Sequence, residues 1–206
     1  EMRALRAQIN PHFLYNSLSL INWKAIEYGQ DDISGITLAL SNYYRTSLNK
    51  GKNTLTVKQE LSNMESYLNI QQIMHDNSFD VVMDIDENVL EYESLNLILQ
   101  PLVENAISYG AEVSLDICTI TVSVRENADA IVMEVIDDGV GMSEEELEAV
   151  RSYTFKPKGH GIGLKNISER LKMDDENSIF YIDSVSGKGT NVTIKLHKRA
   201  KGDQDV

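Results

Sequence analysis

Three segments in the second half of the chain place acidic, amide or glycine residues where chemistry can occur. The first, residues 137–142 (DDGVGM), directly follows an alternating apolar run. Asp137 falls on the core-facing phase of that run, so its carboxylate should be buried and would need a strong donor, such as the amino group of an adenine ring. Gly139 and Gly141 would let the backbone approach such a ligand closely. A plain Asp-Gly turn at the end of a strand is the alternative.

The second segment is a glycine-rich loop at residues 159–164 (GHGIGL), which leads into a helical pattern. Glycines at alternate positions before a helix expose several backbone N–H groups at the positive end of that helix, which suits phosphate. Two lysines just upstream add positive charge. The candidate nucleotide-binding residues of this segment are Lys156, Lys158, Gly159, Gly161, Ile162, Gly163 and Leu164. A hinge loop without a ligand is the alternative.

The third segment is residues 100–110 (QPLVENAISYG), in which Glu104 and Asn105 interrupt an otherwise apolar helical pattern. Asn105 and Tyr109 are four residues apart and share a face of a helix. An amide oxygen can ligate Mg²⁺, which prefers hard oxygen donors and the phosphates of a substrate. The alternative is a partly exposed polar edge of a helix.

The order and spacing of these segments, together with residues 186–190 (SGKGT), resemble the ATP-binding domain shared by histidine kinases, Hsp90, DNA gyrase and MutL. The resemblance implies that Asp137 holds adenine, that Asn105 holds Mg²⁺ and that residues 142–160 form a lid over ATP. It also implies that Tyr109 and Thr190 line the nucleotide site. Ser108 stands where the family usually has Lys or Arg.

The first half narrows the family, because residues 8–18 (QINPHFLYNSL) resemble the phosphoacceptor box of the LytS/YesM-type sensor histidine kinases. The likeness continues through residues 40–45, residues 60–71 and the ATP-binding half. It implies that His12 attacks the γ-phosphoryl group of ATP and passes it to an aspartate on the receiver domain of a response regulator. Neutral imidazole is a competent nucleophile, and Asn16, one helical turn on, could orient the ring or a water.

These residues need two kinds of scaffold. Residues 1–76 show helical periodicity with short polar breaks, and Thr56 with Gln59 or Glu60 can cap the third helix. Residues 77–200 alternate with a period of two around helical patterns at about 95–109 and 161–173. These patterns predict an α+β protein with an N-terminal antiparallel helical hairpin for dimerisation. The resemblance implies that this hairpin also serves phosphotransfer and that residues 77–200 form a Bergerat-type α/β sandwich that binds ATP. Residues 201–206 would be a tail.

The composition excludes several classes of protein. The formal net charge of −13 repels duplex nucleic acid and anionic lipid. Cys118 is the single cysteine, so no internal disulfide can form, and a reducing compartment is expected. No apolar run approaches the roughly 20 residues that span a bilayer. The first eight residues are helix formers without a cap. We therefore expect sensor and membrane-spanning regions upstream, with this part on the cytoplasmic side.

Two other functions fit parts of this pattern. An ATPase clamp of the Hsp90 or gyrase kind would carry a water-activating glutamate four residues before Asn105, where this chain has Pro101. A dimerisation module with a decayed nucleotide site would bind no ATP. The glycines and Asn105 argue against decay, whereas Ser108 keeps that alternative open.

Overall fold

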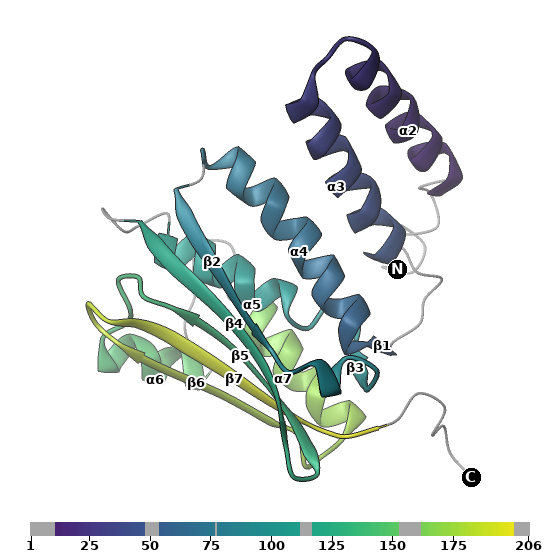
Figure 1. Cartoon of the computed structure of the whole chain (residues 1–206). Helices are drawn as coiled ribbons and strands as arrows, with labels where there is room; N and C mark the ends of the chain where they lie inside the picture. The colour runs from purple at the N-terminus through teal and green to yellow at the C-terminus, as the bar shows by residue number, and fades with distance from the viewer. Residues whose placement is uncertain (1–10, 48–53, 77, 112–116, 153–161, 200–206) are drawn as a thin grey trace.

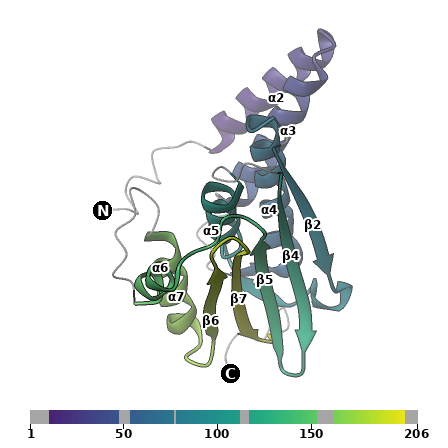
Figure 2. The same ribbon diagram turned by 90° about the vertical axis from the view of Figure 1, so that its left-hand side faces the viewer.

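The computed structural model describes residues 11–47, 54–76, 78–111, 117–152 and 162–199. Helices α2 (Pro11–Glu27) and α3 (Asp31–Ser47) form an antiparallel hairpin, and α4 (Val57–Met74) packs on the other side of α3 (Figure 1). The hairpin projects away from the rest of the chain (Figure 2). Among the described helices, none is long and apolar enough to cross a bilayer. The expected helix before residue 11 lies outside the described residues.

The second half is built on a five-stranded sheet with the order β2-β4-β5-β7-β6. Its strands are β2 (Phe79–Ile85), β4 (Cys118–Asn127), β5 (Ala130–Asp137), β6 (Ile179–Val185) and β7 (Gly189–His197). β2 runs parallel to β4, and the other neighbours are antiparallel. Helices α4, α5 (Gln100–Asn105) and α7 (Ile162–Asp174) all lie on one face of this sheet (Figures 1 and 2). The expected α+β fold is confirmed.

The alternation of apolar and polar residues predicted from the sequence determines which face of each strand the helices cover. Val122 and Met133 point to the helices and are fully buried, while Glu134 on the outer face accepts hydrogen bonds from Asn191 and Thr193. The largest completely buried side chains are Phe79, Met64, Ile98, Leu99, Leu102, Ile120, Ile131, Met133, Ile167, Leu171, Ile194 and Glu60. Glu60 is the one charged member of that set.

Helix α4 begins as its sequence indicates but belongs to the core of the sheet. Thr56 accepts a hydrogen bond from the Gln59 N–H, and the Gln59 side chain accepts one from the Thr56 N–H, which completes a capping box. The apolar stripe of Val57, Leu61 and Met64 lies in the same hydrophobic cluster as the sheet. Although the sequence groups α4 with the helical half, its packing fixes it to the strands.

Several elements differ from the expected pattern. The helix expected at about 95–109 begins at Gln100, because β3 (Glu93–Leu95) pairs with β1 (Thr54–Thr56) as a small antiparallel sheet. A π-helical turn, Ala106–Ala111, follows α5. Within the segment expected to be a lid, Ser143 caps an eight-residue helix, α6 (Glu144–Arg151).

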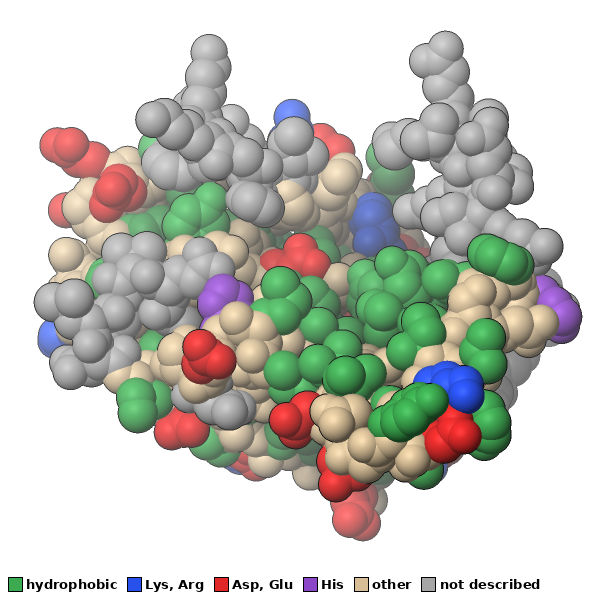
Figure 3. Space-filling view, turned by 90° about the horizontal axis from the view of Figure 1, so that it is seen from above, with side chains coloured by type: hydrophobic (Ala, Val, Ile, Leu, Met, Phe, Trp, Pro, Cys, Tyr) green, Lys and Arg blue, Asp and Glu red, His purple; other side chains and the backbone are tan. Residues whose placement is uncertain are grey.

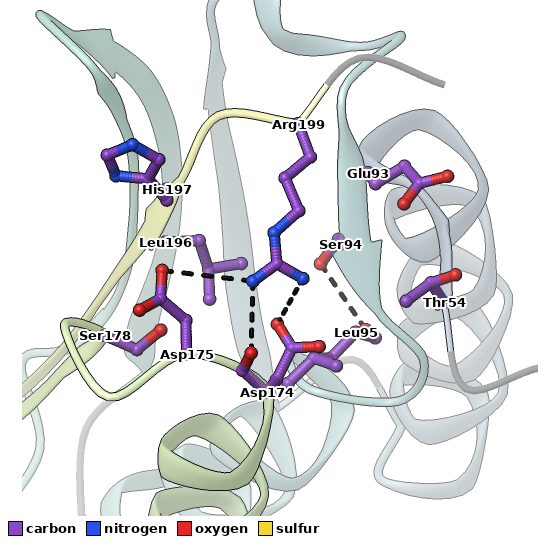
Figure 4. A pocket seen from close by; sticks show the side chains of 10 residues that line it. All are labelled: Thr54, Glu93, Ser94, Leu95, Asp174, Asp175, Ser178, Leu196, His197 and Arg199. Atoms are coloured by element: carbon purple, nitrogen blue, oxygen red, sulfur yellow. Dashed lines mark hydrogen bonds and ion pairs between the residues drawn. The ribbon is translucent and has the colours of Figure 1, made fainter. Parts of the chain in front are cut away.

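The end of β7 is fastened to two other elements by Arg199. Its guanidinium contacts the Asp174 carboxylate at 2.9 Å and the Asp174 carbonyl oxygen at 3.1 Å, and its own carbonyl accepts the Glu93 N–H at 2.8 Å. Figure 4 shows these groups around a small polar pocket. Arg199 also lies 3.9 Å from the Asp175 carboxylate, so its contacts tie the end of β7 to α7 and to β3.

The β4–β5 hairpin gives a direct test of backbone strain. Ala128 turns the chain at φ +44°, a left-handed conformation that costs L-residues about 1 kcal/mol or more. We expect Ala128→Gly to stabilise the protein by roughly 0.5–1 kcal/mol, because glycine adopts this conformation freely. Urea unfolding measures the change. Ala149→Gly inside α6 is the matched control and should destabilise by about 1 kcal/mol; a loss of stability in both variants would contradict this assignment.

Candidate nucleotide site and phosphoacceptor histidine

A buried carboxylate forms the floor of the candidate nucleotide site. Asp137 ends β5, is 7% exposed, and its Oδ1 accepts the Gly139 N–H at 3.0 Å. A Cβ atom added to Gly110 would lie 2.8 Å from Oδ1, and one added to Gly139 would lie 2.4 Å from the Gly110 Cα. The π-helical turn and the loop after β5 therefore meet backbone to backbone around this carboxylate. Gly110 was not singled out from the sequence, although it directly follows Tyr109.

The environment of Asp137 disfavours its charge. Burial raises the pKa of this carboxyl from 3.8 to about 6, and the neighbouring Asp138 adds to the rise, while backbone hydrogen bonds from Gly139 and Thr190 oppose it. At neutral pH the group is mostly ionised. A buried carboxylate of this kind gains from a further strong donor, and the amino group of a purine is one.

Asn105 is the last residue of α5, and Tyr109 lies in the π-helical turn that follows. Asn105 is half-buried, and within the described part of the chain no hydrogen bond engages its side chain, so Oδ1 is available as a hard oxygen ligand. Glu104 instead accepts the Gln100 amide at 2.7 Å. Tyr109 is 44% exposed, so its side chain is accessible to a ligand. The amide oxygen thus fits a magnesium ion that also binds substrate phosphates.

The loop after β5 and the β6–β7 turn pack together. Gly141 has φ +62°, and a Cβ there would lie 2.1 Å from the Val185 carbonyl oxygen. Gly187 donates its N–H to the Val140 carbonyl at 2.7 Å. Thr190 pairs with Asp137 across β5 and β7. Two segments singled out from the sequence, residues 137–142 and 186–190, therefore form one wall of the site.

The described part of the glycine-rich segment begins with helix α7. Gly163 lies in its first turn, and a Cβ there would be 3.8 Å from the Pro101 Cβ, so the starts of α7 and α5 are neighbours. Leu164 packs against the core. The N-terminus of α7, which carries the positive end of the helix dipole, therefore lies beside the start of α5, the helix that ends at Asn105. The remaining predicted phosphate contacts, Lys156, Lys158, Gly159 and Gly161, lie outside the described residues.

His12 lies exposed on α2, a helix that packs against α3 rather than against the sheet that carries Asp137. The Asn16 Nδ2 is 3.3 Å from the His12 Nδ1, so the two predicted residues are in contact. Helix α2 packs on the side of α3 that faces away from the sheet (Figures 1 and 2). The structure therefore pairs Asp137 with Thr190 and packs Gly110, in the turn that follows Asn105, against Asp137, while the His12–Asn16 pair lies on a separate helix.

Comparison with known proteins gives matches over both halves. Residues 1–79 match the family model "Histidine kinase", and residues 91–200 match "Histidine kinase-, DNA gyrase B-, and HSP90-like ATPase". Sensor histidine kinase YesM of Bacillus subtilis is 36% identical over 95% of this chain and 33% of its own length. Sensor protein LytS of Bacillus cereus is 31% identical over 100% and 35%, respectively. The chain thus spans about a third of these curated relatives.

Solved structures agree in fold. The catalytic domain of histidine kinase ThkA has a TM-score of 0.55 at 19% identity and covers 68% of this chain and 95% of that one. The histidine kinase domain of Erythrobacter litoralis EL346 has a TM-score of 0.54 at 14% identity, over 91% and 93%. At these identities the likeness concerns the fold alone.

The close approach of Gly110 and Gly139 can be tested by one methyl group. We expect Gly139→Ala to lower stability by about 1–3 kcal/mol and ATP affinity by at least about tenfold, because the added Cβ requires the two backbone segments to separate. Thermal unfolding and a binding titration measure both effects. Gly35→Ala, where the Cβ meets open space, should leave ATP affinity unchanged. Wild-type affinity and stability in Gly139→Ala would refute the close packing.

Proposed function

Since the chain belongs to the LytS/YesM-type sensor histidine kinases, we propose that it binds Mg-ATP and phosphorylates its own His12. The observation that carries this proposal is the buried Asp137 carboxylate, closed in by the backbone of Gly139 and Gly110, the latter five residues after Asn105. The phosphoryl group then passes to an aspartate on the receiver domain of a response regulator.

Each part of the nucleotide has a matching group in the chain. The Asp137 carboxylate accepts the adenine amino group, and the exposed Tyr109 ring lies against the base. Thr190 and the glycines Gly139 and Gly141 line the wall of the pocket. Asn105 holds Mg²⁺, which would neutralise charge on the phosphates when bound.

In this proposal the phosphates bind at the N-terminus of α7. The N-terminal turn around Gly163 presents backbone N–H groups at the positive end of that helix. Lys156, Lys158 and the preceding glycines complete the phosphate contacts in this proposal.

Asn16 supplies the orientation that His12 needs. With the Asn16 amide turned so that Oδ1 faces the ring, it accepts the Nδ1 proton across the 3.3 Å contact. The neutral imidazole then keeps its lone pair on Nε2, which attacks the γ-phosphorus while the bond to the β,γ-bridging oxygen breaks and ADP leaves. The attacking nitrogen carries no proton in this tautomer. The apolar Phe13, 71% exposed, can therefore occupy the position after His12 without removing a required base.

Transfer requires a second arrangement of the two parts, because α2 lies on the far side of α3 from the sheet. Large apolar side chains are exposed on the hairpin: Leu20, Ile21, Trp23, Ile26, Ile33 and Leu38. Figure 3 shows apolar side chains gathered on this side of the molecule. Such patches mark partner surfaces, so we propose a homodimer in which two hairpins form a helical bundle. The pocket then reaches His12 of its own chain or of the second copy.

The longer relatives extend the proposal. They are named sensor proteins, and this chain spans about a third of their length. We therefore propose that a sensor and membrane-spanning regions elsewhere in the full protein control this kinase part on the cytoplasmic side.

The rival ATPase clamp lacks a residue to activate water. Pro101 stands where that glutamate is needed, and Glu104 is engaged by Gln100. The rival decayed module is disfavoured because the glycines that enclose Asp137 are all present. Both observations favour a kinase.

Autophosphorylation is tested with γ-labelled ATP. We expect acid-labile, alkali-stable label on the wild-type protein and none on His12→Gln, because phosphohistidine hydrolyses in acid. His75→Gln is the matched control, since His75 lies at the end of α4 beside Phe79, and it should keep the label. Label that survives His12→Gln would remove His12 from the reaction.

The pKa of Asp137 predicts how affinity changes with pH. Adenine binds the ionised carboxylate, so affinity should be constant above pH 7 and fall about tenfold per unit below the pKa of about 6. The same raised pKa means that ionisation of Asp137 lowers stability as pH rises from 3.8 to about 6. Calorimetric titrations of wild type and Asp137→Asn between pH 5 and 8, compared as a ratio, cancel the titration of the nucleotide phosphates. The variant should bind more weakly and abolish this dependence; identical pH profiles for both proteins would contradict the assignment.

A further inference from the structure

Glu60 is a buried carboxylate that the proposed chemistry does not use. It lies on α4 with 1% exposure, and its two oxygens accept three consecutive backbone N–H groups, from Leu97 at 2.9 Å, Ile98 at 2.6 Å and Leu99 at 2.8 Å. These residues immediately precede α5, and the N-cap residue Leu99 makes no side-chain cap bond. Glu60 therefore caps α5 from another helix.

The loop that Glu60 holds, residues 96–99, is strained and held from both sides. Leu97 has φ +54°, which costs a non-glycine residue of order 1–3 kcal/mol and persists only where its surroundings enforce it. On the other side of the loop, Arg170 of α7 donates to the carbonyl oxygens of Asn96 and Leu97. Helices α4, α5 and α7 are thus joined through four residues.

The same four residues determine where the candidate ligands for magnesium and phosphate lie. Helix α5 has only six residues, about 9 Å, so its far end at Asn105 follows any shift of its start. The first turn of α7 lies against Pro101 at the start of α5. We propose that Glu60 is a positioning residue for Mg-ATP, holding Asn105 and the N-terminus of α7 at one phosphate group. This inference rests on the proposed function.

The burial of the Glu60 carboxylate has a cost that its hydrogen bonds offset. Burial raises the pKa of Glu60 above 4.5, whereas the hydrogen bonds from Leu99, Ile98 and Leu97 and the positive charge of Arg170 oppose that rise. Removing the carboxylate would leave the three backbone N–H groups without this acceptor, so Glu60 stabilises the loop as well as orienting it. A carboxylate that accepts three converging N–H groups does what an apolar side chain cannot: it fixes the direction of that backbone.

The test separates magnesium-dependent from magnesium-independent binding. Glu60→Gln keeps the size of the side chain but has one acceptor oxygen. Well below its unfolding temperature, this variant should bind ATP about 10–100-fold more weakly with Mg²⁺ present. In chelator, where Asn105 has no metal to hold, the loss should be several-fold smaller, because only the contact of the α7 N-terminus with the phosphates is disturbed. Glu65→Gln, exposed on the same helix, is the matched control and should equal wild type in both conditions.

Each outcome decides a different claim. If wild type itself binds no Mg-ATP, the proposed function is overturned and this inference with it. If wild type binds and Glu60→Gln loses no affinity, or loses it equally with and without Mg²⁺, only the positioning role is overturned. Should Glu60→Gln fail to fold, Arg170→Ala carries the test, since Arg170 holds the same loop. An Mg²⁺ dependence unchanged from wild type in that variant overturns the proposal.

Discussion

The desolvated carboxylate of Asp137 is the constraint on which the rest of the site depends. A strand must end with this residue on its covered face, and two backbone segments must close on it. That closure leaves no room for a Cβ at Gly110 or Gly139. The remaining need for a donor is what makes the position a binding site, because a buried carboxylate is costly until strong hydrogen bonds offset its lost hydration. A plain Asp-Gly turn, the alternative considered for this segment, does not require the carboxylate to be buried.

Helices α5 and α7 extend the proposed nucleotide site beyond Asp137. In the proposed function Asp137 binds the base, and the phosphates lie at α5 and α7, which belong to the helical layer on one face of the sheet. Glu60 and Arg170 fasten both helices to the 96–99 loop. Helix α4 therefore contacts two parts of the molecule: its apolar residues pack in the core, and Tyr67, which borders that core, also lies near Tyr43 of α3. Contacts therefore run from α3 of the hairpin through α4 to the loop that precedes α5 and to α7.

The sequence predicted what local patterns decide. Alternating residues gave β4, β5 and β7, the Thr56 and Gln59 pair gave the start of α4, and the glycine segments located the loops around Asp137. Features that depend on tertiary contacts were not predicted. The left-handed Leu97, the π-helical turn after Asn105 and the burial of Glu60 arise from three helices meeting, and Glu60 reads in the sequence as an ordinary first-turn acid. The short β1–β3 pairing likewise lacks a signal, since three residues are too few for a period.

A crystal structure with Mg²⁺ and a non-hydrolysable ATP analogue tests the account most directly. It should place the adenine amino group within hydrogen-bonding distance of the Asp137 carboxylate, the metal on the Asn105 oxygen and the phosphates at the first turn of α7. A nucleotide bound elsewhere on the chain, with the surroundings of Asp137 closed and unchanged, would contradict it.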